Sequence, residues 1–336
     1  MKKALILLLS LAIISVSCKH KNRFKIDTSD IKVNLRIIPF YKEFFAVQPD
    51  SIYKYIPKWQ KEYGQFWEVY NYAILGLGSP ESADYIKNLK NFRDYCMSLS
   101  IMQDVEKVFP EGDNFIEKKL TDAFAHYKYY FPDKTIPKIY TTITGFNVSV
   151  YTGNDFVGIS LEKYLGKDYP LYKELMFDRY KRARMTKDML PIDVMRAWAV
   201  AEFPYNDSVN NLLTNMIYQG RIQYFLKAMM PDAPDTLLWA YTPEQLKWAQ
   251  AYEKNIWDYL IDKKLLFSTK NIDIKTFTGD AAFTTPFHKN SAPKAGTWVG
   301  YKIVEAFMDN NPDITLAQLM NITDYMQIYN LSYYEP

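Results

Sequence analysis

The chain is poor in the two residue types that most often build disulfides and zinc sites. Its 336 residues include two cysteines, Cys18 and Cys96, and three histidines, His20, His126 and His288. A catalytic zinc site usually draws two histidines from one helix, one turn apart. No two of these histidines have that spacing, so we expect no metal and no other cofactor. Cys96 lies in an apolar helical stretch, which predicts a core residue rather than a nucleophile.

Several catalytic and binding motifs are also missing. There is no Gly-x-x-x-x-Gly-Lys-Ser/Thr loop for phosphate and no Gly-x-Ser-x-Gly nucleophile turn. Gly76-x-Gly78 lacks the third glycine of a dinucleotide site. The segment that starts at Asp309 has Ile314 and Met320 where a calcium loop requires glycine and glutamate. No residue can be assigned a catalytic role from these patterns.

The chain also has little excess charge of one sign. The chain has 41 Lys and Arg against 38 Asp and Glu, a formal net charge of +3. A nucleic-acid-binding face would require clustered excess cations, so we expect no nucleic-acid partner. A basic cluster at 19–25 has two interpretations: it rests against anionic lipid headgroups, or it is a solvated tether.

The N-terminus carries the most informative pattern that is present. Lys2 and Lys3 precede an apolar run at 4–14, and small residues at 15–17 lead to Cys18. This pattern predicts a secretory signal whose apolar run is too short to span a bilayer. The cysteine makes it a lipoprotein signal, with Cys18 acylated as the mature N-terminus and two acyl chains giving stable anchoring. A soluble secreted protein with an incidental Cys18 is the alternative, since Ser15 stands where leucine is usual.

Cleavage at this site defines the expected organisation. Removing residues 1–17 leaves 319 residues with a formal charge of +1, and Cys96 as the one thiol free to react. No internal disulfide is then possible. We expect a tether at 18–32 and a single α+β domain at 33–336. The acidic residues that surface-exported lipoproteins carry after the cysteine are missing, which favours a periplasm-facing position in the cell envelope.

The hydrophobic pattern predicts an α+β fold that is predominantly helical. Residues 33–40 alternate as in a strand. Runs at 138–143, 147–151 and 156–161, separated by glycine-containing turns, predict a small antiparallel meander near the middle of the chain. Helices are expected at 82–100, 114–130, 193–203, 208–230, 242–264, 297–310 and 315–328. Start signals of the capping kind occur at 207–208 and 242–245.

Several segments together resemble one family. They are the lipoprotein signal and the segments at 158–166, 191–204, 216–221, 285–287 and 296–301. In order and spacing they are similar to the gliding-motility lipoprotein GldB family of the Bacteroidetes, over essentially the whole chain. The resemblance implies a cell-envelope lipoprotein required by, or associated with, the gliding machinery and linked protein secretion. Non-gliding relatives carry such proteins too, so the resemblance does not imply that the organism glides.

The layout is also similar to zincin-like metallopeptidases. In that group a small sheet precedes a helix bearing His-Glu-x-x-His, and a later helix supplies a glutamate just before a glycine. Here the first helix has Met195, Arg196 and Ala199 at those places, and Gln219 precedes Gly220. None of the ligand positions carries a suitable zinc donor. The resemblance therefore implies a peptidase-shaped scaffold without the metal-activated water of a peptidase.

A vestigial cleft would be lined by Arg196, Glu202, Gln219 and Tyr301. Alternatively, Arg196 belongs to a buried ion pair and Glu202 is a surface carboxylate. Gly220 in mid-helix costs about 1 kcal/mol relative to alanine, and close packing against the preceding helix is a sufficient reason for it. Convergence of the four residues on one open cleft would favour ligand binding, and dispersal would favour a scaffold.

Three hypotheses for function remain. The leading one is a non-enzymatic, membrane-anchored envelope lipoprotein that binds a protein or peptide partner of the motility and secretion apparatus. The second is an envelope hydrolase, a peptidase or glycan hydrolase, that uses metal-independent carboxylate chemistry at residues such as Glu202. The third is a cleft for a small molecule or lipid, which the 16% aromatic content permits.

Overall fold

The computed structural model describes residues 23–336, so the predicted signal peptide and Cys18 lie outside the described residues. The strands are β1 (Ile37–Ile38), β2 (Lys138–Thr142), β3 (Val150–Thr152) and β4 (Phe156–Ser160). The helices are α1 (Phe40–Ala46), α2 (Ile52–Tyr63), α3 (Gln65–Glu68), α4 (Tyr85–Ser98), α5 (Ile101–Val108), α6 (Phe115–Tyr130), α7 (Pro170–Glu174), α8 (Arg179–Arg182), α9 (Leu190–Glu202), α10 (Leu212–Met229), α11 (Asp235–Trp239), α12 (Pro243–Ala251), α13 (Glu253–Asp262), α14 (Asn271–Thr278), α15 (Ala295–Asn310), α16 (Leu316–Asn321) and α17 (Tyr325–Ser332). The prediction of a predominantly helical α+β fold is confirmed.

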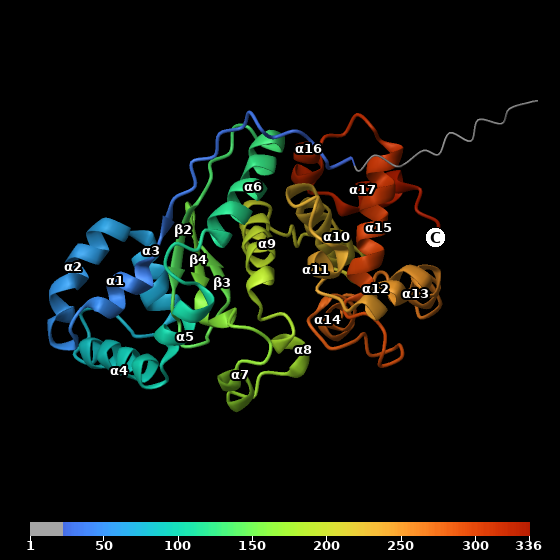
Figure 1. The fold of residues 1–336 in the computed structure, drawn as a ribbon. Coiled ribbons are helices and arrows are strands. Elements are labelled where there is room, and N and C mark those ends of the chain that lie inside the picture. Colours follow the sequence, from blue (N-terminus) through green and yellow to red (C-terminus); the bar gives the residue numbers. More distant parts are fainter. Residues whose placement is uncertain (1–22) are drawn as a thin grey trace, which may run out of the picture.

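The sheet lies between two groups of helices. Helix α1 packs on β2, and α9 packs on β3 and β4. Figure 1 shows the N-terminal helices on one side of the sheet and α6 and α9 on the other, with the C-terminal helices beyond them. One continuous cluster of buried apolar side chains joins these parts, from Phe24 to Ile328.

The predicted antiparallel meander is wrong in its strand order. The order is β1-β2-β4-β3, in which β2 pairs parallel with β4 and only β3 and β4 form an antiparallel pair. All five residues of β4 are buried. A strand covered on both faces is a central strand, and its sequence is a continuous apolar run rather than an alternation. The predicted strand at 33–40 is reduced to two residues that pair parallel with β2.

A buried carboxylate holds the connection that carries the chain across β4. Glu162 Oε1 accepts hydrogen bonds from the Thr144 backbone N–H at 2.7 Å, the Thr144 hydroxyl at 2.9 Å and the Phe146 N–H at 3.1 Å. Glu162 is fully buried, and its Oε2 has no partner among the described residues. Burial, which these hydrogen bonds only partly offset, raises the pKa of Glu162.

The predicted long helices exist, with two of them divided. The expected helix at 242–264 is α12 followed by α13, and that at 315–328 is α16 followed by α17. Thr242 and Gln245 form the capping box that the sequence predicts. The start signal at 207–208 is wrong, because α10 begins later, with a capping box between Asn211 and Thr214.

Helices α10 and α15 cross in close backbone contact. A Cβ atom added to Gly220 would lie 2.2 Å from the Gly300 carbonyl carbon, and one added to Gly300 would lie 1.9 Å from the Met216 carbonyl oxygen. Gly220 is therefore required for close packing, as predicted, but the partner is α15 rather than the preceding helix. This crossing fixes the two helices that support the site described below.

The start of the described chain is packed against the helical half. Phe24 is buried, with its ring edge-on to the Tyr224 ring at a centroid distance of 4.9 Å. Arg23 pairs with Asp309, and Lys25 pairs with Asp232 at 2.7 Å. Part of the predicted tether at 18–32 thus contacts the body instead of forming a solvated spacer. Figure 1 shows residues that follow running along the surface toward β1.

Candidate functional site

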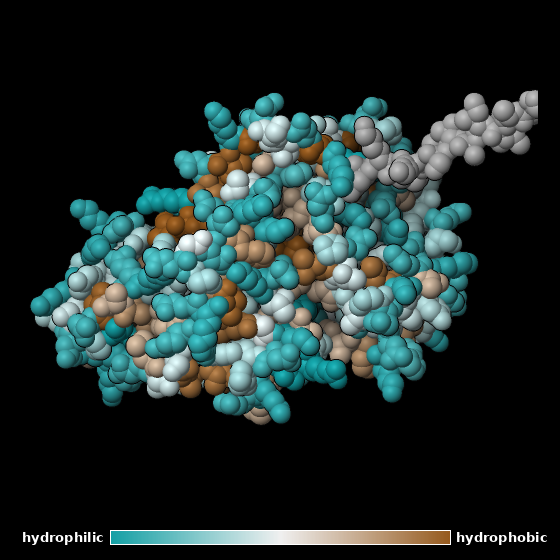
Figure 2. Space-filling view, in the orientation of Figure 1, coloured by the Kyte–Doolittle hydropathy of each residue, from teal (hydrophilic) through white to brown (hydrophobic). Residues whose placement is uncertain are grey.

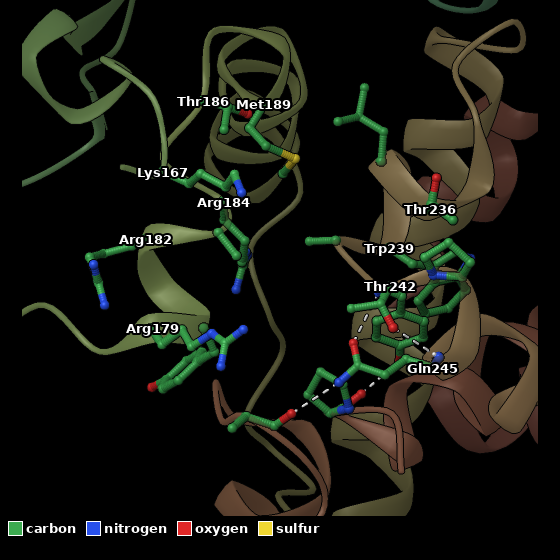
Figure 3. A pocket seen from close by; sticks show the side chains of 18 of the residues that line it. Lys167, Arg179, Arg182, Arg184, Thr186, Met189, Thr236, Trp239, Thr242 and Gln245 are labelled. Atoms are coloured by element: carbon green, nitrogen blue, oxygen red, sulfur yellow. Dashed lines mark hydrogen bonds between the residues drawn. The ribbon is translucent and has the colours of Figure 1, made fainter. Parts of the chain in front are cut away.

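A cavity of about 1010 Å³ opens between two walls that are far apart in the sequence. One wall is α8 with the residues that follow it to Met189, and the other is the end of α11 and the start of α12. Lys294, just before α15, also lines it. Figure 3 shows Arg179 and Arg184 of the α8 wall opposite Trp239, Thr242 and Gln245, whereas the Arg182 side chain points away from them. We call this cavity the α8–α12 pocket.

The α8–α12 pocket is lined mainly by cations. Its basic lining residues are Lys167, Arg179, Arg182, Arg184, Lys289 and Lys294, and its acidic ones are Asp168 and Asp188. This is a strong local imbalance in a chain with a net charge of only +3. Figure 2 shows hydrophilic side chains over this part of the surface, where α7 and α8 lie in Figure 1. The pocket is therefore suited to an anionic ligand.

Two of these cations share one internal carboxylate. Asp280, which follows α14, accepts from Arg184 at 3.0 Å and from Lys294 at 2.5 Å. Burial acts to raise the pKa of Asp280, but the charges of Lys294 and Arg184 outweigh it and hold that pKa well below its usual range. Burial lowers the pKa of Lys294, against the opposing effect of Asp280. The three groups form a charged bridge with an excess of one positive charge, in which Arg184 and Lys294 line the pocket and Asp280 lies outside the lining.

The remaining cations of the pocket have fewer ion-pair partners. Arg179, Arg182 and Lys289 form no ion pair within residues 23–336, and Lys167 is 3.5 Å from the neighbouring, exposed Asp168. The Nε atom of Arg182 is buried without a hydrogen-bond partner in the described chain. A guanidinium group without an ion-pair partner can bind a carboxylate or phosphate without first losing a partner from its own chain.

The opposite wall is aromatic and rigid. The Trp239 and Tyr241 rings stack at 5.5 Å, and the Tyr241 hydroxyl donates to the Pro293 carbonyl at 2.7 Å. Gln245 is held in the capping box and also donates to the Ala282 carbonyl at 3.1 Å. This wall supplies a preformed apolar surface facing the cations, and its Tyr241 and Gln245 side chains already have hydrogen-bond partners.

Behind this wall lies Arg196, one of the predicted cleft residues. It donates to Gln223 Oε1 at 3.0 Å and to the Leu238 carbonyl at 3.2 Å. Burial, only partly offset by Asp193, lowers the pKa of Arg196 to about 10. Asp193 accepts from the Tyr164 hydroxyl at 3.0 Å, and burial raises its pKa despite the nearby charges of Arg184 and Arg196. Arg196 adds positive charge below the pocket without lining it.

The structure does not bring the four predicted cleft residues together. Glu202 lies at the end of α9, paired with Lys134 and accepting from Tyr127 at 3.2 Å. The Tyr301 hydroxyl donates to Glu305 at 3.0 Å, and the Tyr301 ring is perpendicular to the Trp239 ring at a centroid distance of 5.4 Å. Gln219 is half-buried on α10. None of the four lines the α8–α12 pocket. The alternative of a buried ion pair at Arg196 also fails, because within the described residues its partners are an amide and a carbonyl.

The comparison with known families decides the assignment. The family model of the gliding motility protein GldB matches residues 21–336. The chain belongs to the GldB family. Membership of this lipoprotein family links the chain to gliding motility and agrees with a membrane-anchored envelope protein. Comparisons with curated proteins and with solved structures find no match, so the zincin-like layout stays a prediction.

Neither a metal site nor a membrane span is found in the part of this GldB-family chain that the structure describes. Residues 23–336 contain no group of three or more His, Cys, Asp or Glu side chains placed to hold a metal ion. No helix in the same range is both long and apolar enough to cross a bilayer. His126 is half-buried on α6 and His288 is exposed in a loop, while Cys96 is buried, as predicted.

The residues that line the pocket were not predicted from the sequence. Residues 179–184 contain four basic residues in six positions, a density comparable to the cluster at 19–25. That run was the available signal. Lys294 and Asp280 could not have been connected to it, because they lie about a hundred residues later and meet Arg184 only through the fold.

Proposed function

We propose that this GldB-family protein is a lipid-anchored, non-catalytic envelope protein that binds a protein partner of the motility and secretion machinery in the α8–α12 pocket. The observation that carries the proposal is the pocket itself. It joins a row of under-neutralised cations to a rigid aromatic wall, a combination that binds and orients a ligand.

Catalysis is not part of the proposal. Glu202, the carboxylate considered for hydrolysis, is neutralised by Lys134 and lies outside the pocket. The pocket lining offers two carboxylates, Asp168 and Asp188, among six cations, and among the described residues it includes no histidine or cysteine. Purified protein that hydrolyses peptide or peptidoglycan substrates would support the hydrolase alternative instead.

The predicted anchor at Cys18 bears on how the pocket is oriented relative to the membrane. Arg23 is five positions after Cys18, so their Cα atoms lie within about 18 Å of one another. Arg23 and Phe24 are packed on the body beside α10 and α15. In Figure 1 that end of the body is opposite α8. The proposed arrangement therefore holds the helical end near a periplasm-facing membrane surface and directs the pocket away from it.

The test is photocrosslinking in cells that carry the gene at its natural site. A photoreactive residue in place of Thr236, which lines the pocket, should form one main adduct in the membrane fraction. The same residue in place of Lys118, exposed on α6, should not form that adduct. With Cys18→Ala, the protein should leave the membrane fraction, and the adduct and function should be lost together. Absence of an adduct at Thr236 in a functional strain would contradict the proposal.

A further inference from the structure

Asp280 pairs with two cations of the pocket lining, and the residues that follow it, Ala281 and Ala282, line the pocket. Its carboxylate lies between Arg184, which follows α8, and Lys294, which precedes α15. The Asp280 side chain is 54% exposed, whereas those of Arg184 and Lys294 are 28% and 27% exposed. The Asp280 carboxylate is therefore the most solvent-exposed of the three groups, and the two cations are largely covered. An exposed group on a loop can be displaced at a lower cost than a buried one.

The carboxylates near these cations are fewer than the cations: they are Asp280, the lining Asp168 and Asp188, and the buried Asp193. Arg184 and Lys294 share Asp280, and Arg179 and Arg182 form no ion pair with any residue in 23–336. Arg196 adds a further positive charge from behind the wall. Like charges gathered in a partly enclosed cavity repel each other, and an anion that enters relieves that repulsion.

We propose that the α8–α12 pocket recognises an acidic segment of the partner protein, in which one carboxylate replaces Asp280 between Arg184 and Lys294. A second carboxylate of the same segment binds Arg179. This inference rests on the proposed function for the presence of a protein partner, and it adds the chemistry by which that partner is recognised. Asp280 then acts as an internal competitor that sets the affinity.

The form of the pocket favours carboxylates over phosphate. Two helix starts at its edge are already occupied: in α12 the Gln245 N–H is bonded to the Thr242 hydroxyl at 3.2 Å, and in α15 the Ala295 N–H is bonded to the Thr284 hydroxyl at 3.0 Å. Free backbone N–H groups at a helix start are the usual phosphate cradle. The cations also come from separate segments, at 167, 179–184, 289 and 294, instead of converging on one tetrahedral group. A chain that carries several planar carboxylates matches such a distribution, and each guanidinium can bind one in a bidentate manner.

The experiment measures peptide binding by the full lipoprotein in a non-ionic detergent. The probes are fluorescein-labelled hexaglutamate and hexaglutamine, followed by fluorescence anisotropy at low and at physiological salt. Inorganic pyrophosphate serves as a competitor, to distinguish a phosphate site from a carboxylate site. We expect hexaglutamate to bind, hexaglutamine not to bind, and the affinity to fall with salt.

Two matched pairs of variants locate the binding. Arg179→Gln with Arg182→Gln should weaken hexaglutamate binding about tenfold, whereas Lys118→Gln with Lys119→Gln removes the same charge from exposed positions of α6 and should not. Asp280→Asn should tighten binding about threefold to tenfold, because it removes the competitor. Asp50→Asn, which removes the partner of Lys90 at 2.7 Å, should leave it unchanged.

The results separate this inference from the proposed function. Equal loss in the two double variants, or unchanged or weaker binding by Asp280→Asn, would overturn the inference. Displacement by pyrophosphate without binding of hexaglutamate would assign a phosphate ligand and overturn it as well. If the Thr236 adduct still forms in cells in either case, the proposed function survives without its acidic ligand. If hexaglutamate binds as expected but the adduct does not form, the proposed function fails.

Discussion

The crossing of α10 and α15 should be intolerant of a single methyl group. In Gly300→Ala the added Cβ would lie 1.9 Å from the Met216 carbonyl oxygen and 2.3 Å from its carbon, where ordinary contact needs at least 3.4 Å. The two backbones would have to separate by about 1.5 Å, and neither clashing atom belongs to a flexible side chain. The same separation would displace Lys294, which immediately precedes α15.

Two opposing effects decide the magnitude. Alanine in place of glycine favours a helix by about 1 kcal/mol. Overpacking of a close-packed interior costs about 1–3 kcal/mol and more when backbone must move. Because the contact is backbone to backbone, we expect the upper end and a net loss of about 2 kcal/mol or more in the free energy of unfolding.

The assay is urea unfolding of the purified protein, followed by tryptophan fluorescence. Gly220→Ala should act in the same direction, since its Cβ would lie 2.2 Å from the Gly300 carbonyl carbon. Gln219→Ala, on the half-buried neighbouring position, is the control and should change stability by less than about 0.5 kcal/mol. A stable Gly300→Ala protein, within error of wild type, would refute the close crossing.

Three further predictions concern groups outside the pocket. Because burial raises the pKa of Glu162 in the folded protein, its contribution is fully present below its unfolded pKa and is lost as pH rises through the folded pKa. Glu162→Gln stays neutral, so its unfolding free energy should gain on that of wild type as the pH rises above the usual range of a glutamate carboxyl group, and parallel pH profiles would argue against the shift. Phe24→Ala should cost about 3 kcal/mol and expose the segment before β1 to proteolysis, because it removes the edge-on contact with Tyr224; unchanged protease resistance would contradict the docking. Glu202→Gln removes the ion pair with Lys134 and should cost at most about 1 kcal/mol while leaving hexaglutamate binding intact; lost binding would return Glu202 to the site.

Local sequence patterns predicted the helices well, but they did not predict the order of the strands in the sheet. The capping box at Thr242 and Gln245 is a contact within one turn and could be predicted directly. The insertion of β4 between β2 and β3 could not, because glycine-containing turns fit a meander equally well. The fully buried run at Phe156–Ser160 was the available indication of a central strand.

The candidate site was harder to predict because its residues meet only in the folded chain. Arg184 and Asp280 are 96 positions apart, and no spacing rule connects them. The family resemblance directed attention to the helix at 190–202, whose Arg196 lies behind the pocket wall and not in it. The basic run at 179–184 could have been weighed as a binding signal from composition alone.

The most direct test of the central claim is complementation of a strain that lacks the gene. The strain receives either the Arg179→Gln, Arg182→Gln variant or the Lys118→Gln, Lys119→Gln variant, and gliding and protein secretion are measured at equal amounts of membrane-bound protein. We predict that the pocket variant is as defective as the deletion and that the α6 variant is fully active. Equal restoration of both activities by the two variants would show that the α8–α12 pocket is not where this protein works.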